Sequence, residues 1–287
     1  LLNRAYWVVS AAYAVALIVA IITYRAGFLS DLVLDLLLAD LAATGVIFIF
    51  SFAVRNSSLY DPYWSLAPMI LWCFLIVQSE ALSTRLMLCG AVIMVWGARL
   101  TWNWTRTWRD LTEEDWRYRQ LQSDSGRAYW LVSLFGIHLF PTVLVFLGCM
   151  GLIRAAEAGE TPLNMLDLAG IIIGASSIWI EARADSALHQ FRANRTHREE
   201  HIQQSVWRWC RHPNYLGEIG VWVAIGCFGL AAVGWETLVI AGPLAMILLF
   251  TLITIPMIEK KLAADKPGYA EYQRQTPMLL PYGRLKN

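Results

Sequence analysis

Long apolar blocks follow one another along almost the whole chain and leave it few ways to fold. A helix needs roughly 20 apolar residues, within a range of about 17–25, to cross the hydrocarbon core of a membrane. Several blocks meet that length, and three need their polar flanks to reach across. The blocks are Ala5–Tyr24, Leu34–Val54, Leu66–Val77, Leu86–Trp104, Trp130–Ile153, Leu168–Ile180, Ile219–Val233 and Leu238–Ile258. They predict an all-α, polytopic transmembrane helical bundle of seven to eight spans, as a single integral-membrane domain over residues 1–287.

The composition agrees with this class and excludes others. The chain has 287 residues, of which 57% are hydrophobic and 16% are charged, whereas a soluble domain is usually about 25% charged. The formal net charge is +1. Bulk charge therefore favours neither a nucleic-acid partner nor an acidic substrate.

Positive charge alternates between successive connections. Arg106–Arg127 holds five arginines, and Arg183–Arg211 holds six arginines and three histidines. The tail after Glu259 is also rich in lysine and arginine, whereas the connections between these segments are poor in both. Because cytoplasmic connections carry the excess of Lys and Arg, we expect the three basic segments to face the cytoplasm. With eight spans, the N-terminus lies on that side as well.

No metal site is expected. The five cysteines are far apart, and none has the spacing of a zinc site. His197 and His201 have the i, i+4 spacing of metal ligands, but they lie among arginines that would repel a cation.

Ionisable residues continue into the spans instead of stopping at their ends. In "WIEARADSALHQFRANR", Glu181, Asp185, His189 and Arg192 share one helix face. In "TWNWTRTWRD", the residues on one face are Asn103, Arg106 and Asp110. Ionisable side chains at membrane depth are costly and rarely face lipid, so both stretches predict functional sites.

A third polar stretch, "RHPNYLGEIGVW", opens an apolar block. Pro213 suits the first turn of a helix, since its missing N–H is not needed there. Asn214 and Glu218 then lie one turn apart on one face. A helix N-terminus beside arginines is a ready anion site, and phosphate is the natural ligand.

Asp61 lies among aromatic residues in "NSSLYDPYWSLAP". A poorly hydrated aromatic pocket favours the neutral acid, which can donate a hydrogen bond to a carbonyl and so stabilise an enolate. The alternative is that Asp61 caps a helix or turn at the interface. The sequence leaves both open.

These motifs resemble those of the steroid 5α-reductase family and its small bacterial members. The resemblance covers about the C-terminal two-thirds of the chain and includes "RHPNYLGE", "ARADSALHQFR" and "GYAEYQRQTPMLLPY". The motif "RHPNY" is also similar to that of the sterol reductases, and isoprenylcysteine carboxyl methyltransferases share its Arg-His-Pro run. The resemblance implies an integral protein of the bacterial inner membrane, with an NADPH site facing the cytoplasm and formed mainly by residues 100–287.

The implied activity is NADPH-dependent reduction of a C=C bond conjugated to a ketone, as in a 4-ene-3-oxo-steroid converted to its 5α-dihydro product. The implied cofactor-binding residues are Arg106, Arg117, Asp185, Arg192, Trp207, Arg211, His212, Asn214, Tyr215 and Glu218. Asp61 is the implied acid at the substrate ketone. The chain has Tyr60-Asp61 where the steroid enzymes carry Gln-Glu, and Asn103 where they carry a tyrosine. Asn103 or a tyrosine, Tyr60 or Tyr63, is therefore expected to complete the catalytic group.

Two other functions stay open at this stage. One is an S-adenosylmethionine-dependent membrane methyltransferase on the same fold, although a sulfonium cofactor has no need of several arginines. The other is a non-catalytic membrane protein that binds a sterol or lipid. In each case the expected partners are membrane lipid and an apolar small molecule.

Overall fold

The computed structural model describes residues 2–79, 82–197 and 199–280. Over these ranges it is helical and contains no strand, which confirms the all-α prediction. Eight helical segments among them are long and apolar enough to cross a membrane. They are Arg4–Ala26, Leu32–Val54, Ser57–Gln78, Thr84–Thr107, Trp116–Gly148, Met165–Asn194, Pro213–Val233 and Thr237–Asp265. The three short blocks do extend into their polar flanks, whereas the block predicted over Trp130–Ile153 is interrupted at Cys149.

The chain divides into two compact units. Unit 1 comprises Leu1–Ser79 and Trp96–Leu147, and unit 2 comprises Glu80–Val95 and Gly148–Asn287. The single domain over residues 1–287 stays a prediction.

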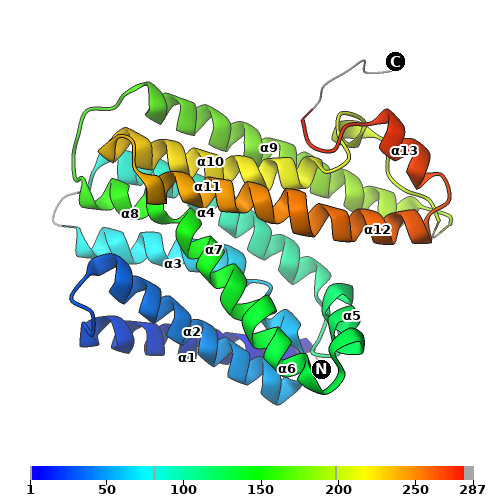
Figure 1. The fold of residues 1–287 in the computed structure, drawn as a ribbon, viewed down its shortest axis with the longest axis horizontal. Helices are drawn as coiled ribbons and strands as arrows, with labels where there is room; N and C mark the ends of the chain where they lie inside the picture. Colours follow the sequence, from blue (N-terminus) through cyan, green and yellow to red (C-terminus); the bar gives the residue numbers. More distant parts are fainter. Residues whose placement is uncertain (1, 80–81, 198, 281–287) are drawn as a thin grey trace. The chain divides into compact units, whose positions relative to one another are not determined.

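Unit 1 is built around two antiparallel helices, α1 and α2, which pack side by side (Figure 1). The Asp31 side chain accepts a hydrogen bond from the Leu34 N–H and so caps the start of α2. At the other end of α2, Arg55 takes a left-handed conformation with φ of 57°. The elements are α1 (Leu2–Ala26), α2 (Leu32–Val54), 3₁₀-helix η1 (Ser57–Tyr60), α3 (Tyr63–Gln78), the end of α4 (Thr84–Thr107), α5 (Trp116–Ser125), 3₁₀-helix η2 (Gly126–Ala128), α6 (Tyr129–Val132), π-helix η3 (Ser133–Leu139) and α7 (Phe140–Gly148).

Unit 2 is organised around α10, which contacts α8, α9 and α11 (Figure 1). Trp222 and Phe228 of α10 are fully buried. Pro213 is in the first turn of α10, as predicted, and Gly234, with φ of 76°, ends it. The elements are the start of α4, α8 (Met150–Glu157), α9 (Met165–Asn194), 3₁₀-helix η4 (Ser205–Arg208), α10 (Pro213–Val233), α11 (Thr237–Leu248), π-helix η5 (Leu249–Thr254), α12 (Ile255–Asp265) and α13 (Tyr269–Gln275).

Glycines let α10 approach α9 closely. A Cβ at Gly217 would lie 2.6 Å from Glu181 Cβ and 2.7 Å from the Ser177 carbonyl oxygen. Small residues at such crossings bring helix backbones together in membranes, where van der Waals packing drives association. This contact fixes the start of α10 against the middle of α9.

We predict that Gly217→Ala lowers the stability of the protein by roughly 1–3 kcal/mol, because overpacking forces the two helices apart. The matched control is Gly45→Ala in α2, where nothing lies within 4 Å of the added Cβ. That change should be neutral or stabilising, since glycine costs a helix roughly 0.5–1 kcal/mol relative to alanine. Thermal unfolding in detergent measures both, and equal shifts would contradict the packing role of Gly217.

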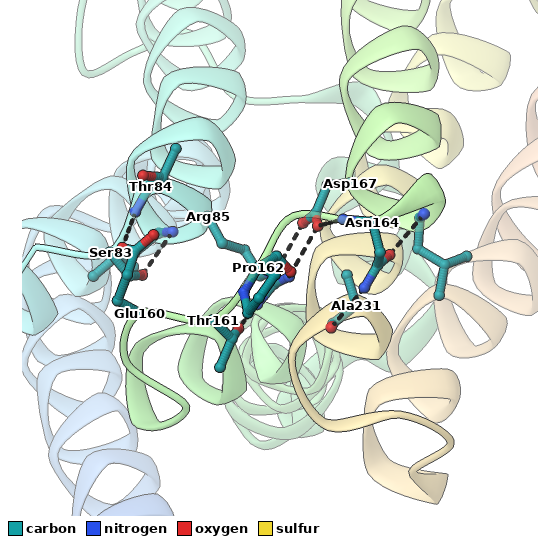
Figure 2. A network of polar contacts seen from close by, with 11 residues as sticks. Ser83, Thr84, Arg85, Glu160, Thr161, Pro162, Asn164, Asp167 and Ala231 are labelled. Atoms are coloured by element: carbon teal, nitrogen blue, oxygen red, sulfur yellow. Dashed lines mark hydrogen bonds and ion pairs between the residues drawn. The ribbon is translucent and has the colours of Figure 1, made fainter.

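A buried ion pair joins the start of α4 to the start of α9 within unit 2 (Figure 2). Arg85 Nε donates to Asp167 Oδ1 over 2.7 Å, and the two side chains are only 1% and 2% exposed. The Arg85 guanidinium also donates to Thr161 Oγ1 and to the Pro162 carbonyl oxygen. Asp167 further accepts the Asn164 N–H over 2.8 Å, which completes a capping box at the start of α9.

We predict that Arg85→Met destabilises the protein by roughly 3–5 kcal/mol, because it leaves the Asp167 carboxylate buried without its partner. Adding Asp167→Asn should recover part of this loss, since the amide oxygen still accepts the Asn164 N–H. The thermal unfolding midpoints of the single and double variants test the pair. A double variant less stable than Arg85→Met would argue against it.

Candidate functional site

Asp61 lies between η1 and α3 in unit 1. Its Oδ1 accepts a hydrogen bond of 2.8 Å from the hydroxyl of Tyr118, on α5. The Arg117 guanidinium lies over the Tyr118 ring, 5.8 Å from its centroid. The N-cap position of α3 is occupied by Pro62. The Asp61 carboxylate thus bonds a tyrosine 57 positions further along the chain. It also has a side-chain hydrogen bond with Ser58 of η1.

The polar run before Asp61 holds the connection to α5 in place. Asn56 Nδ2 donates to the carbonyl oxygens of Leu111 and Glu113, at 2.8 Å each. The Ser58 hydroxyl accepts the Asp115 N–H over 2.9 Å. This clamp brings the start of α5, and with it Tyr118, to Asp61.

The other two predicted catalytic residues lie in unit 1 with other contacts. The Tyr60 hydroxyl forms a 2.7 Å hydrogen bond with Thr142 Oγ1, and its ring stacks on Tyr63 at 5.1 Å between centroids. Asn103 is half-buried on α4, where its carbonyl oxygen accepts the Thr107 hydroxyl. The hydroxyl that bonds Asp61 is therefore that of Tyr118, and the predicted role of Asn103, Tyr60 or Tyr63 at the substrate stays a prediction.

Two predicted cofactor arginines also belong to unit 1. Arg106 is exposed in the last turn of α4. Arg117 pairs with Asp115 through two bonds of 2.9 and 3.0 Å. Arg106 is therefore the more accessible of the two to a ligand.

In unit 2, several predicted cofactor residues gather where α9 meets the start of α10. The buried Trp207 donates its indole N–H to the Ala184 carbonyl oxygen over 3.0 Å, directly beside Asp185. Arg192 lies within electrostatic reach of Asp185 and Tyr215. The structure thus brings these four residues to one region.

Arg192 belongs to a cluster of positive charges, formed with Arg195 and Lys266, that we call the cation cluster. Burial lowers the pKa of Lys266 below its usual value, and the neighbouring Arg195 and Arg192 lower it further, against the opposing effect of Asp265 and Glu200. Like charges held together repel one another, and a bound anion would relieve that repulsion. The cluster therefore has the chemistry of a phosphate site.

Arg211 and His212 are engaged by the tail of the chain. Arg211 Nε and His212 Nε2 both bind Glu259 Oε1, at 2.6 and 2.9 Å. Their backbone N–H groups donate to the carbonyl oxygens of Pro277 and Met278, at 2.9 and 3.1 Å. These two predicted cofactor residues hold the tail against the start of α10.

Asn214 and Glu218 follow one turn apart on α10. Glu218 is buried and accepts the Trp222 indole N–H over 3.2 Å. The Asn214 Oδ1 atom is buried and, among the residues the structure describes, has no hydrogen-bond partner. An unpaired buried acceptor is costly, and a ligand N–H or O–H would satisfy it.

Sequence reasoning missed Tyr118, Arg195 and Lys266. Tyr118 directly follows Arg117, whereas Arg195 and Lys266 lie in basic segments that the sequence analysis used only to assign topology. Within the described ranges, no three His, Cys, Asp or Glu side chains gather as a metal site would require.

Comparison with known proteins gives the family. The model of a protein family of unknown function, DUF1295, matches residues 47–276, and the chain belongs to this family. An uncharacterised protein of Schizosaccharomyces pombe is 24% identical over 258 residues, covering 79% of this chain and 73% of the yeast protein. No solved structure matches the chain.

Proposed function

We propose that this protein is an integral-membrane, NADPH-dependent oxidoreductase that reduces a C=C bond conjugated to a ketone. The substrate class is an apolar enone, such as a 4-ene-3-oxo-steroid taken from the bilayer. The observation that carries the proposal is the hydrogen bond between Asp61 and Tyr118. The resemblance to steroid 5α-reductases supports it, since the DUF1295 family includes proteins of that kind.

The Asp61–Tyr118 pair has the chemistry needed at the ketone. With Asp61 protonated, its carboxyl O–H donates to the Tyr118 oxygen, and the Tyr118 O–H is then available to the ketone oxygen. Hydride addition to the β-carbon moves negative charge onto that oxygen. A donor held in position in a water-poor site stabilises this charge, and the α-carbon then takes up a proton.

NADPH would supply the hydride, and the residues of unit 2 fit its polar parts. Phosphates only accept hydrogen bonds, so they suit Arg192, Arg195 and Lys266. The buried Asn214 Oδ1 needs a donor, which a ribose hydroxyl or a carboxamide N–H₂ provides. The predicted cytoplasmic position of the basic segments would give this site access to a soluble nucleotide.

The proposal is tested by purifying the full chain in detergent and following NADPH oxidation with a 4-ene-3-oxo-steroid. We expect oxidation of NADPH and one saturated ketone formed for each NADPH consumed. S-adenosylmethionine and a saturated sterol are titrated in parallel. Tight S-adenosylmethionine binding without reduction of any enone would replace the proposal with a methyltransferase, and tight sterol binding alone would replace it with a binding protein.

We predict that Asp61→Asn and Tyr118→Phe each lower kcat by about 10²–10³-fold, because each removes one group that stabilises charge on the ketone oxygen. The Kd for NADPH should stay unchanged. The control is Tyr24→Phe, at a tyrosine that packs edge-on against Phe74, and it should keep wild-type kcat. A raised Kd for NADPH together with an unchanged kcat would contradict the prediction and would place both residues at the cofactor.

We also predict that Lys266→Met raises the Kd for NADPH about tenfold or more, since a charge-assisted hydrogen bond contributes about 1.5–3 kcal/mol. The matched control is Lys260→Met, which removes an exposed lysine of α12. Isothermal titration with NADPH and with NADH separates binding of the 2′-phosphate, which only NADPH carries, from binding of the rest of the nucleotide. Equal effects of the two substitutions would rule out the cation cluster as the phosphate site.

A further inference from the structure

A carboxyl group, that of Asp40, lies near the middle of a membrane-spanning helix in unit 1. Asp40 is on α2, about 12 Å along the helix axis from Leu32 at 1.5 Å per residue. The hydrocarbon core of a membrane is about 30 Å thick, and α2 is long and apolar enough to cross it. Ionisable side chains at such depth are costly, so a function is the first hypothesis for Asp40.

The Asp40 side chain is bonded by a tyrosine of another helix. The Tyr63 hydroxyl, at the start of α3, donates to Asp40 Oδ1 over 2.5 Å. Among the residues that the structure describes, no lysine, arginine or histidine pairs with this carboxyl group. Without a base beside it, the neutral acid is the less costly form at membrane depth.

Holding α3 against α2 does not require a carboxyl group at this position. The Tyr63 hydroxyl also lies 3.1 Å from the backbone carbonyl oxygen of Asp40, an acceptor that any residue there would supply. Tyr63 is further bonded to Thr44, one turn along α2, and Thr44 Oγ1 lies 2.7 Å from Thr142 Oγ1. An apolar side chain in place of the carboxyl would leave these contacts intact. The carboxyl group of Asp40 therefore needs another explanation.

The neutral acid has a donor to offer to a ligand. Because Asp40 Oδ1 accepts the Tyr63 hydroxyl, Oδ2 is the oxygen that carries the acid proton. Asp40 is only half-buried, so unit 1 by itself does not enclose the carboxyl group. A carboxyl O–H donates to oxygen acceptors, such as a carbonyl or a hydroxyl oxygen. In an apolar site, a single polar group of this kind fixes the orientation of the ligand.

The Asp40–Tyr63 pair is close in the chain to the Asp61–Tyr118 pair. Asp61 and Tyr63 are two residues apart, so their Cα atoms lie within about 7 Å of each other. The ring of Tyr60, directly before Asp61, stacks on the Tyr63 ring with 5.1 Å between centroids and 16° between planes. Two Asp–Tyr pairs thus lie on either side of stacked aromatic rings, within reach of one ligand of a few fused rings.

We propose that the Asp40 carboxyl O–H donates a hydrogen bond to a second oxygen of the substrate, at the end remote from the enone. This inference rests on the proposed function, in which the enone ketone lies at Asp61 and Tyr118. It narrows the substrate class to an apolar enone that carries a hydroxyl or a second carbonyl far from the reacting bond. Asp40 is then a positioning residue, because it determines which end of the molecule lies at Asp61.

The test compares two 4-ene-3-oxo-steroids that differ only at C17, where one has a hydroxyl group and the other has hydrogen. Their Kd values are measured on the full chain in detergent with NADP⁺ present, so that no hydride is transferred. The two steroids partition differently into detergent, so the quantity compared between variants is the ratio of the two Kd values.

Three variants separate the hydrogen bond from the fold. Asp40→Leu removes both carboxyl oxygens, whereas Asp40→Asn keeps an acceptor for Tyr63 and an N–H donor for the ligand. The matched control is Asp35→Asn, at the other acidic residue of α2, which is buried and accepts the Leu29 N–H over 3.0 Å. The asparagine oxygen can still accept that N–H, so the control changes an acid of the same helix without disturbing Asp40.

We expect Asp40→Leu to reduce the preference for the hydroxylated steroid about tenfold, the effect of losing one hydrogen bond in a water-poor site. Asp40→Asn and Asp35→Asn should keep the wild-type ratio. An unchanged ratio in Asp40→Leu, an equal loss in Asp35→Asn, or no binding of either steroid would overturn the role of Asp40. Loss of the preference in Asp40→Asn would overturn its role as a donor.

Reduction of both steroids by NADPH is assayed on the same samples. Reduction of both without any dependence on Asp40 would remove this inference and leave the proposed function standing. A binding preference that depends on Asp40, without reduction of either steroid, would leave the oxygen site standing and remove the proposed function.

Discussion

In a membrane, polar groups must find their partners within the protein, because the hydrocarbon core offers none. Most features of this structure follow from that constraint. Backbone groups are satisfied in helices, and polar side chains in the spans reach across to other helices. Arg85 bonds Asp167, Tyr118 bonds Asp61, and Glu259 holds both Arg211 and His212. These contacts determine which helix ends meet in each unit.

Under the same constraint, some polar residues hold neighbouring segments together, whereas others are left at the candidate site. Asn56 and Ser58 bind the connection to α5, and this leaves Asp61 next to Tyr118. In unit 2, Arg211 and His212 bond Glu259 and the tail, whereas Arg192 and Lys266 gather with Arg195 as a cluster of positive charges. Residues of one motif can thus serve either structure or ligand binding, and the partner of each side chain decides which.

The sequence predicted which segments carry the candidate site, but it predicted few of the contacts between their side chains. The sequence singled out Asp61, the face of Asp185 and Arg192, and the start of α10, because polar residues at membrane depth are conspicuous. It did not reveal Tyr118 as the partner of Asp61, since the two are 57 positions apart and tyrosine is unremarkable at an interface. Lys266 was equally hidden, because its neighbours Arg192 and Arg195 come from a distant helix.

By itself, the sequence determined that the chain is helical with seven to eight apolar spans, and it placed Pro213 in the first turn of a helix. These are local properties, set by block length, caps and backbone freedom. Only the tertiary structure decided the Asp61–Tyr118 pair and the cation cluster. Each depends on hydrogen bonds or charges between helices remote in sequence, and such bonds form only where packing brings the helices within about 3 Å of one another's polar atoms.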